Sequence, residues 1–194
     1  MHFVITDGGG APNVVPAAAT VWYFIRADSH KDVEYNFSWI NDIARGAALM
    51  TRTELSVHVD TDCHEVIPNT PLAELLYENL VEIGVPEFTP EEEAFARRLQ
   101  QPLIEEFGTG FDLALERTIR TLAESAEPAK GSTDVGDISW FVPTGGIRTA
   151  CFVADSPGHS WQNVACIGSS IGEKGILYAS KVLAVSAIEL FERE

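Results

Sequence analysis

Basic residues are scarce in this sequence, and their scarcity restricts the partners that the protein can bind. The chain has 13 lysine and arginine residues against 29 aspartate and glutamate residues, a formal net charge of −16. A surface this negative repels phosphate backbones, so we expect no nucleic-acid partner. Apolar runs are short as well. None reaches the roughly 18 residues of a membrane span, so we expect no membrane partner.

Cysteine is also scarce, and no targeting signal is evident. Cys63, Cys151 and Cys166 are widely spaced and form no CxxC pair. This pattern fits reduced thiols in a cytoplasm better than a disulfide framework. The N-terminus has no basic region followed by an apolar one, so the sequence predicts no signal peptide and a cytoplasmic location.

Residues 1–62 show the pattern of a β-β-α-β module. Residues 2–6 and 20–26 are rich in β-branched and aromatic residues, as strands are. Ser29 resembles a helix cap, and residues 53–60 alternate apolar and polar side chains like a strand. A ferredoxin-like unit has the order β-α-β-β-α-β. The module therefore reads as an incomplete ferredoxin-like domain that lacks its first strand and helix.

Residues 63–194 predict an α/β region that begins with helices. Thr70 followed by proline is expected to cap one helix, and Thr89 opens a capping box for the next. Pro102 is expected to kink or stop that second helix. A further helix is predicted from about Asp112 to Ser125.

The remainder of this region predicts strands and a last helix. Short apolar stretches at 138–142 and 149–154 read as strands, and Ser170 with Glu173 caps the final helix. Helices that alternate with strands indicate an α/β fold, which is the fold class we predict.

Two apparent sites are better explained by structure than by chemistry. His58 and Asp60 spell a His-x-Asp pair, but they lie on the polar side of the predicted strand 53–60 and are interpreted as its solvated face. The glycines 8–10 lack the Gly-Lys-Ser/Thr of a phosphate loop and read as a turn that fixes the place of Asn13.

Six residues could bind a ligand or could be ordinary surface. Asn13 offers a neutral donor and Arg26 a planar fork suited to a carboxylate, although an arginine at a strand end is often only solvated. His159 could ligate a metal or could bond to backbone. Residues 132–134 could be a turn or a set of polar donors around a ligand.

Three segments together resemble a known family. They are HFVITDGGGAPNVVP at 2–16, GSTDVGDISW at 131–140 and PGHSWQ at 157–162. In this order they are similar to the p-aminobenzoyl-glutamate hydrolase group of the aminoacylase and carboxypeptidase zinc metallopeptidases. The resemblance extends over essentially the whole chain and corresponds to the C-terminal half, or less, of a family member.

The resemblance implies an architecture and a set of residue roles. A dizinc exopeptidase-like α/β catalytic domain, here its C-terminal part at 63–194, carries a lid and dimerisation domain, here 1–62. Asn13 and Arg26 would hold the substrate's carboxylate, and His159 would ligate one of two zinc ions. Ser132, Thr133 and Asp134 would line the substrate pocket.

The same resemblance implies what is missing. The family's other zinc ligands and its general base have no counterpart in these 194 residues, so we assign no catalytic residue and expect little hydrolysis by the chain alone. The expected partners are a small amide substrate with a carboxylate, a second copy bound through the lid, and a complementing N-terminal half. The alternative is a non-catalytic module for dimerisation or carboxylate binding.

Overall fold

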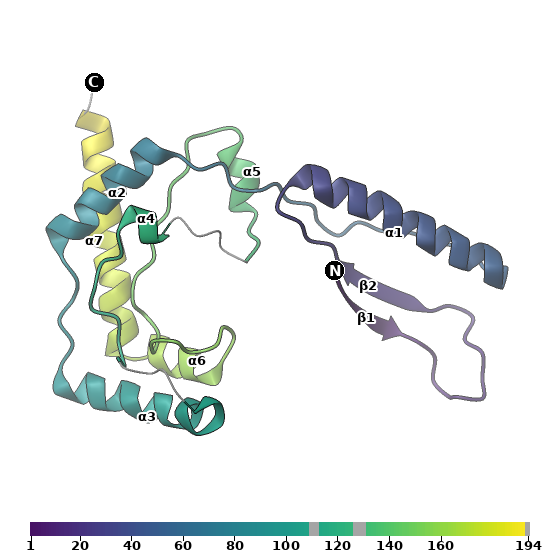
Figure 1. Ribbon diagram of the computed structural model, residues 1–194, viewed down its shortest axis with the longest axis horizontal. Coiled ribbons are helices and arrows are strands. Elements are labelled where there is room, and N and C mark those ends of the chain that lie inside the picture. The colour runs from purple at the N-terminus through teal and green to yellow at the C-terminus, as the bar shows by residue number, and fades with distance from the viewer. Residues whose placement is uncertain (109–112, 126–130, 193–194) are drawn as a thin grey trace. The chain divides into compact units, whose positions relative to one another are not determined.

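The computed structural model describes residues 1–108, 113–125 and 131–192, which divide into two compact units (Figure 1). The first unit comprises Met1–Ile67 and Lys130–Val142, and the second comprises Pro68–Ala129 and Pro143–Glu194. Helices and strands both occur, which is compatible with the predicted α/β class. The helix predicted from residue 112 begins outside the described residues.

The first unit opens with the two predicted strands, which pair as an antiparallel hairpin. They are β1 (His2–Asp7) and β2 (Thr20–Phe24), with Phe3 opposite Tyr23 and a register shift between Ile5 and Asp7. Side chains alternate across a strand, so apolar residues at successive positions occupy both faces. All of them are exposed: Phe3, Val4, Ile5, Val21, Trp22, Tyr23 and Phe24.

Helix α1 (His30–Thr51) begins where the cap predicts. The Ser29 hydroxyl accepts a hydrogen bond from the Asp32 backbone N–H at 3.2 Å. The helix ends at Arg52, whose φ of 56° lies in the left-handed region that terminates many helices.

The strand predicted at 53–60 is not observed. This segment has no regular secondary structure, and its apolar residues Leu55, Val57 and Val59 are exposed. A strand needs a neighbour for its backbone hydrogen bonds. No segment in the described ranges pairs with this one, so the alternating pattern alone does not produce a strand.

The two later strands are also absent. Residues 138–142 belong to a short helix, α5 (Val135–Ser139), and the turn after it, where Phe141 N–H donates to Ile138 O at 3.0 Å. Residues 149–154 are irregular, and Ala154 N–H donates to Ala114 O at 2.9 Å. An apolar run this short in the sequence does not show whether the segment forms a strand, a helix or an irregular stretch.

The second unit begins with α2 (Thr70–Ile83), whose cap lies one residue before the predicted one. The Asn69 side chain accepts from Leu72 N–H at 3.0 Å, and Thr70 is already helical. The helix ends at Gly84, as predicted, because glycine tolerates the φ of 75° found there.

Helix α3 (Pro90–Phe107) has the predicted capping box but continues through its proline. Thr89 and Glu92 bond each other's backbone N–H groups. Pro102 cannot donate to the preceding turn, yet Leu99 and Leu103 on either side of it are buried. We infer that this packing holds the helix together across the proline.

The helix predicted at 112–125 is much shorter in the structure. Residues 113–121 are irregular, and α4 (Leu122–Ser125) is one turn long. Leu115 lies within the irregular part and is almost fully buried, so its apolar side chain serves the core without helical backbone.

The core of the second unit forms around the last helix. Helix α7 (Ser170–Glu192) packs against α2 and α6 (Trp161–Ile167), and α6 packs against α3. Ile171 is 0% exposed, in a cluster with Leu99, Leu115 and Val153. None of the helices in the described ranges combines the length and apolar character needed to cross a membrane.

Two isoleucines of α7 provide a matched test of this core. We expect Ile171→Ala to lower the free energy of unfolding by about 2–5 kcal/mol, because it leaves a cavity in a closed cluster. Ile176 is 55% exposed, and Ile176→Ala should change the same quantity by no more than about 0.5 kcal/mol. Urea unfolding measures both, and equal losses would contradict the core described here.

Candidate functional site

The two residues predicted to hold a carboxylate are both exposed in the first unit. Asn13 lies in the loop between β1 and β2, and Arg26 follows β2. The guanidinium carbon of Arg26 stands 5.5 Å from the centre of the Phe24 ring, a distance typical of a cation–π contact. The guanidinium group of Arg26 therefore contacts an aromatic ring, while the residue as a whole remains exposed.

The predicted pocket-lining residues Ser132, Thr133 and Asp134 precede α5 and are also exposed. The Thr133 hydroxyl accepts from Val135 N–H at 3.3 Å, and its carbonyl accepts from Gly136 N–H at 3.3 Å. Asp134 stands at the cap position of α5 without a side-chain capping bond. These contacts describe a turn that begins a helix, which is the plainer of the two readings of this motif.

The predicted zinc ligand His159 lies in the second unit, in the loop before α6. Its side chain is exposed, and its φ of 60° is in the left-handed region. Such a conformation costs a non-glycine residue roughly 1–2 kcal/mol. The fold therefore holds this histidine in an unfavourable backbone geometry.

In the described part of the first unit, no side-chain hydrogen bond joins one of the five predicted residues found there to another. Five belong to the first unit and His159 to the second. Their joint action on one substrate stays a prediction from the resemblance.

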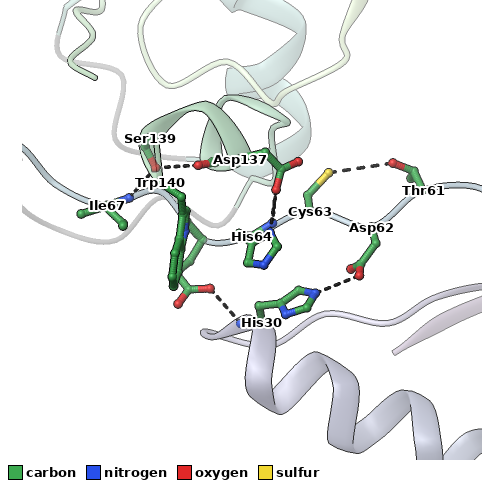
Figure 2. A network of polar contacts seen from close by, with 11 residues as sticks. His30, Thr61, Asp62, Cys63, His64, Ile67, Asp137, Ser139 and Trp140 are labelled. Carbon is green, nitrogen blue, oxygen red and sulfur yellow. Dashed lines mark hydrogen bonds and ion pairs between the residues drawn. The ribbon is translucent and has the colours of Figure 1, made fainter. Parts of the chain in front are cut away.

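A cluster of histidines and carboxylates in the first unit was not predicted from the sequence (Figure 2). His30 Nε2 lies 2.8 Å from Asp62 Oδ2, and His64 Nδ1 lies 2.8 Å from Asp137 Oδ1. The two imidazoles stack with ring centres 4.0 Å apart. Each ring therefore has its own carboxylate partner, which lets the two rings lie face to face.

Backbone contacts fix the same cluster. The Glu65 carboxylate accepts from His30 N–H at 2.8 Å, while the indole N–H of Trp140 donates to Glu65 O at 3.0 Å. Ser139 Oγ accepts from Ile67 N–H at 2.8 Å. Figure 2 shows these side chains converging from the start of α1, the segment 61–67 and α5. The cluster attaches the GSTDVGDISW segment to the rest of its unit.

Glycine is required at one position of this contact. A Cβ on Gly136 would lie 1.9 Å from the backbone oxygen of His64. The second glycine of the GSTDVGDISW segment therefore allows α5 to approach the 61–67 backbone closely. Gly136, Asp137 and Trp140 were the sequence signal from which this cluster could have been found. Nothing in the sequence showed which distant residues these three would contact.

The cluster shifts the pKa values of its members in opposite directions. The hydrogen bond to Asp62 raises the pKa of His30 above its ordinary 6.5. The backbone N–H and then the imidazole of His64 lower the pKa of Asp137 below 3.8. The backbone N–H of His30 is the main cause that lowers the pKa of Glu65 below 4.5. All three shifts favour the charged forms.

None of the described residues forms a group of three or more histidine, cysteine, aspartate or glutamate side chains able to hold a metal ion. His58 and Asp60, which were interpreted as a solvated face, are exposed, with His58 Nε2 3.3 Å from Asp60 Oδ1. A lone histidine such as His159 offers at most one ligand, whereas structural and catalytic zinc sites use three or four protein ligands. The described residues do not fit a complete zinc site.

The chain is similar in sequence to curated proteins that are named as a hydrolase subunit and as dipeptidases. The chain is 36% identical, over 98% of its length, to a p-aminobenzoyl-glutamate hydrolase subunit of Escherichia coli (strain K12), and covers 44% of that protein. It is 27% and 26% identical to the Xaa-Arg dipeptidases of Mus musculus and Homo sapiens, of which it covers 37% and 36%. These matches confirm the resemblance drawn from the three motifs.

The chain spans less than half the length of the curated relatives it matches. No family model matches it, and no solved structure matches it.

The pKa shifts predict that the cluster contributes most to stability in mildly acidic solution. A raised pKa at His30 contributes stability that is complete below pH 6.5 and is lost as the pH rises through the folded-state value. The lowered pKa values of Asp137 and Glu65 contribute stability above 3.8 and 4.5, which acid removes. We expect the contribution of the cluster to be largest between about pH 4.5 and 6.5.

The measurement is the free energy of unfolding from pH 3 to pH 9. His30→Gln should flatten the decline above pH 6.5, and Asp137→Asn should flatten the decline in acid. His58→Gln is the control, because that side chain is 86% exposed. The same pH profile in all three variants would contradict this role of the cluster.

Proposed function

We propose that this chain is part of a zinc-dependent amidohydrolase that cleaves an N-acyl amino acid or an aminobenzoyl-glutamate-like amide. The observation that carries this proposal is the occurrence of the three motifs in family order, within a 36% identity that extends over 98% of the chain. A hydrolase subunit and two dipeptidases among the relatives agree on hydrolysis of an amide bond.

Asn13 and Arg26 are proposed to hold the carboxylate end of the substrate. Arginine presents parallel N–H donors that match the two oxygens of a carboxylate, and the asparagine amide adds a neutral donor. The support of the Arg26 guanidinium by Phe24 favours this role, since it limits the conformations that binding must restrict. The turn at Ser132, Thr133 and Asp134 is proposed to line the substrate pocket.

His159 is proposed as a zinc ligand, with two zinc ions in the complete active site. Bound zinc would polarise the amide carbonyl and lower the pKa of water. The described residues do not form the remaining coordination set, so we propose that the other ligands and the general base come from polypeptide beyond these 194 residues. The chain alone should therefore hydrolyse little or nothing.

The proposed partners follow from the name of a relative and from the surface of the first unit. The E. coli relative is named as a subunit, which favours an assembly of more than one chain. Apolar side chains exposed on both faces of the β1–β2 hairpin support contact with further polypeptide. We propose that residues 1–62 form a ferredoxin-like lid through which two copies dimerise, and that the assembly acts in the cytoplasm.

The same exposed hairpin supports a second candidate function. A module that only dimerises or binds a carboxylate would need the apolar hairpin faces and Arg26, and would need neither zinc nor a base. Metal content and hydrolysis separate the two candidates only in an assembly that also contains the proposed complementing polypeptide, since both candidates predict carboxylate binding and neither predicts tight zinc binding or hydrolysis by the chain alone.

The first test is the metal content and activity of the purified chain. After equilibration with Zn²⁺ and removal of free metal, we expect well under one zinc per chain, because a lone imidazole cannot hold the ion tightly. Assays with p-aminobenzoyl-glutamate should show little or no cleavage. Two bound zinc ions, or cleavage abolished by a chelator and restored by zinc, would contradict the incomplete site.

The second test is the substitution of Arg26 in an active assembly that contains this chain. We expect Arg26→Ala to raise KM by roughly 10- to 100-fold with a smaller effect on kcat, the range that one charge-assisted hydrogen bond gives. The control is Arg45→Ala, since Arg45 is exposed on α1 and paired with Asp42 at 2.8 Å. An unchanged KM in Arg26→Ala would argue against the carboxylate role.

A further inference from the structure

The loop before α6 is held in a conformation that its own residues disfavour. Asp155 and His159 have φ values of 58° and 60°, and neither is glycine. Residues with a Cβ rarely adopt this region. Contacts from outside the loop must therefore maintain it.

Asn163, on the first turn of α6, contacts the loop at three points. Its Nδ2 donates to Pro157 O at 3.1 Å, and its backbone N–H donates to Ser160 Oγ at 3.4 Å. Its Oδ1 also forms a short hydrogen bond with Ser156 Oγ. These contacts lie on both sides of His159.

The donor inventory fixes the direction of these bonds. Pro157 O is an acceptor, so the amide nitrogen of Asn163 must face it and the amide oxygen must face Ser156. Ser156 has a single hydroxyl hydrogen, which it then donates to Asn163. Val153 O also lies 2.8 Å from that hydroxyl oxygen, and it still accepts a hydrogen bond from the backbone N–H of Ser156 at 3.3 Å.

Both ends of the loop are anchored independently of Asn163. Ala154 N–H donates to Ala114 O at 2.9 Å, and Gln100 Nε2 donates to Ala154 O at 3.2 Å. On the other side, Gln162 and Cys166 of α6 are buried. The loop can therefore lose its internal contacts while its ends stay in place.

We propose that Asn163 is a positioning residue that clamps the 155–160 loop and thereby fixes the backbone from which His159 presents its imidazole. The value of this clamp for catalysis rests on the proposed role of His159 as a zinc ligand. A ligand on a preordered loop loses less conformational entropy when a metal binds, so the clamp would raise metal affinity.

The test is the order of the loop in the metal-free chain, measured as backbone NMR order parameters at Gly158, His159 and Ser160. In the unchanged chain we expect values of about 0.85, as in rigid backbone. In Asn163→Ala we expect them to fall below about 0.6, the range of flexible segments. The melting temperature should change little, since both anchors remain.

Three further variants make this result specific. Asn163→Asp keeps the oxygen that faces Ser156 and loses the donor to Pro157, so its order parameters should lie between those of the unchanged chain and Asn163→Ala. Ser156→Ala combined with Asn163→Ala should add little to the single change. Val164→Ala, on an exposed position of the same helix, should leave the loop ordered.

Unchanged order in Asn163→Ala, or an equal loss of order across the whole second unit, would overturn the clamp. Because no metal is present, neither outcome bears on zinc binding. The zinc role is tested separately, by zinc content and activity before and after His159→Ala in an active assembly. A failure there would refute the proposed ligand while the clamp could still stand.

Discussion

The arrangement of the first unit depends on one carboxylate oxygen. Asp137 Oδ1 accepts both the backbone N–H of His64, at 2.9 Å, and its imidazole N–H, at 2.8 Å. This contact joins positions 73 residues apart, and a charged acceptor makes it stronger than a neutral hydrogen bond. The close approach at Gly136 and the indole bond of Trp140 both require that α5 lie here. Without Asp137, the α5 helix and the polar turn before it would lose a charged contact that attaches them to the 61–67 segment.

In the second unit, the buried carboxylate of Glu92 has a comparable role, because it joins distant segments by hydrogen bonds. The Glu92 carboxylate closes the capping box with Thr89 and accepts from Ser170 at 2.6 Å and Lys174 at 2.6 Å. It therefore ties the start of α3 to the start of α7. Gln100 in the same helix holds the loop that leads to His159. Within this unit, polar side chains therefore act together with the apolar core to place the helices, and the described residues form no extended sheet there.

Local signals predicted local structure well. The caps at Ser29 and Thr89 were visible because a capping hydrogen bond joins residues three apart. Partners that are distant in sequence were not visible. His30 and His64 could not be paired with their carboxylates from spacing. The continuation of α3 through Pro102 depends on buried neighbours that the sequence does not identify. For the candidate site, the sequence motifs identified the residues. The structure then showed the contacts that hold the loops in which those residues lie.

The incorrect strand at 53–60 is informative in its own right. Its alternation places Leu55, Val57 and Val59 on one face, yet all three are exposed. The hairpin likewise exposes apolar residues on both faces. Such patterns stabilise a sheet only when a neighbouring strand accepts the backbone hydrogen bonds and another layer covers the side chains. The residue pattern of the first unit is therefore suited to a sheet larger than the one formed by the described residues.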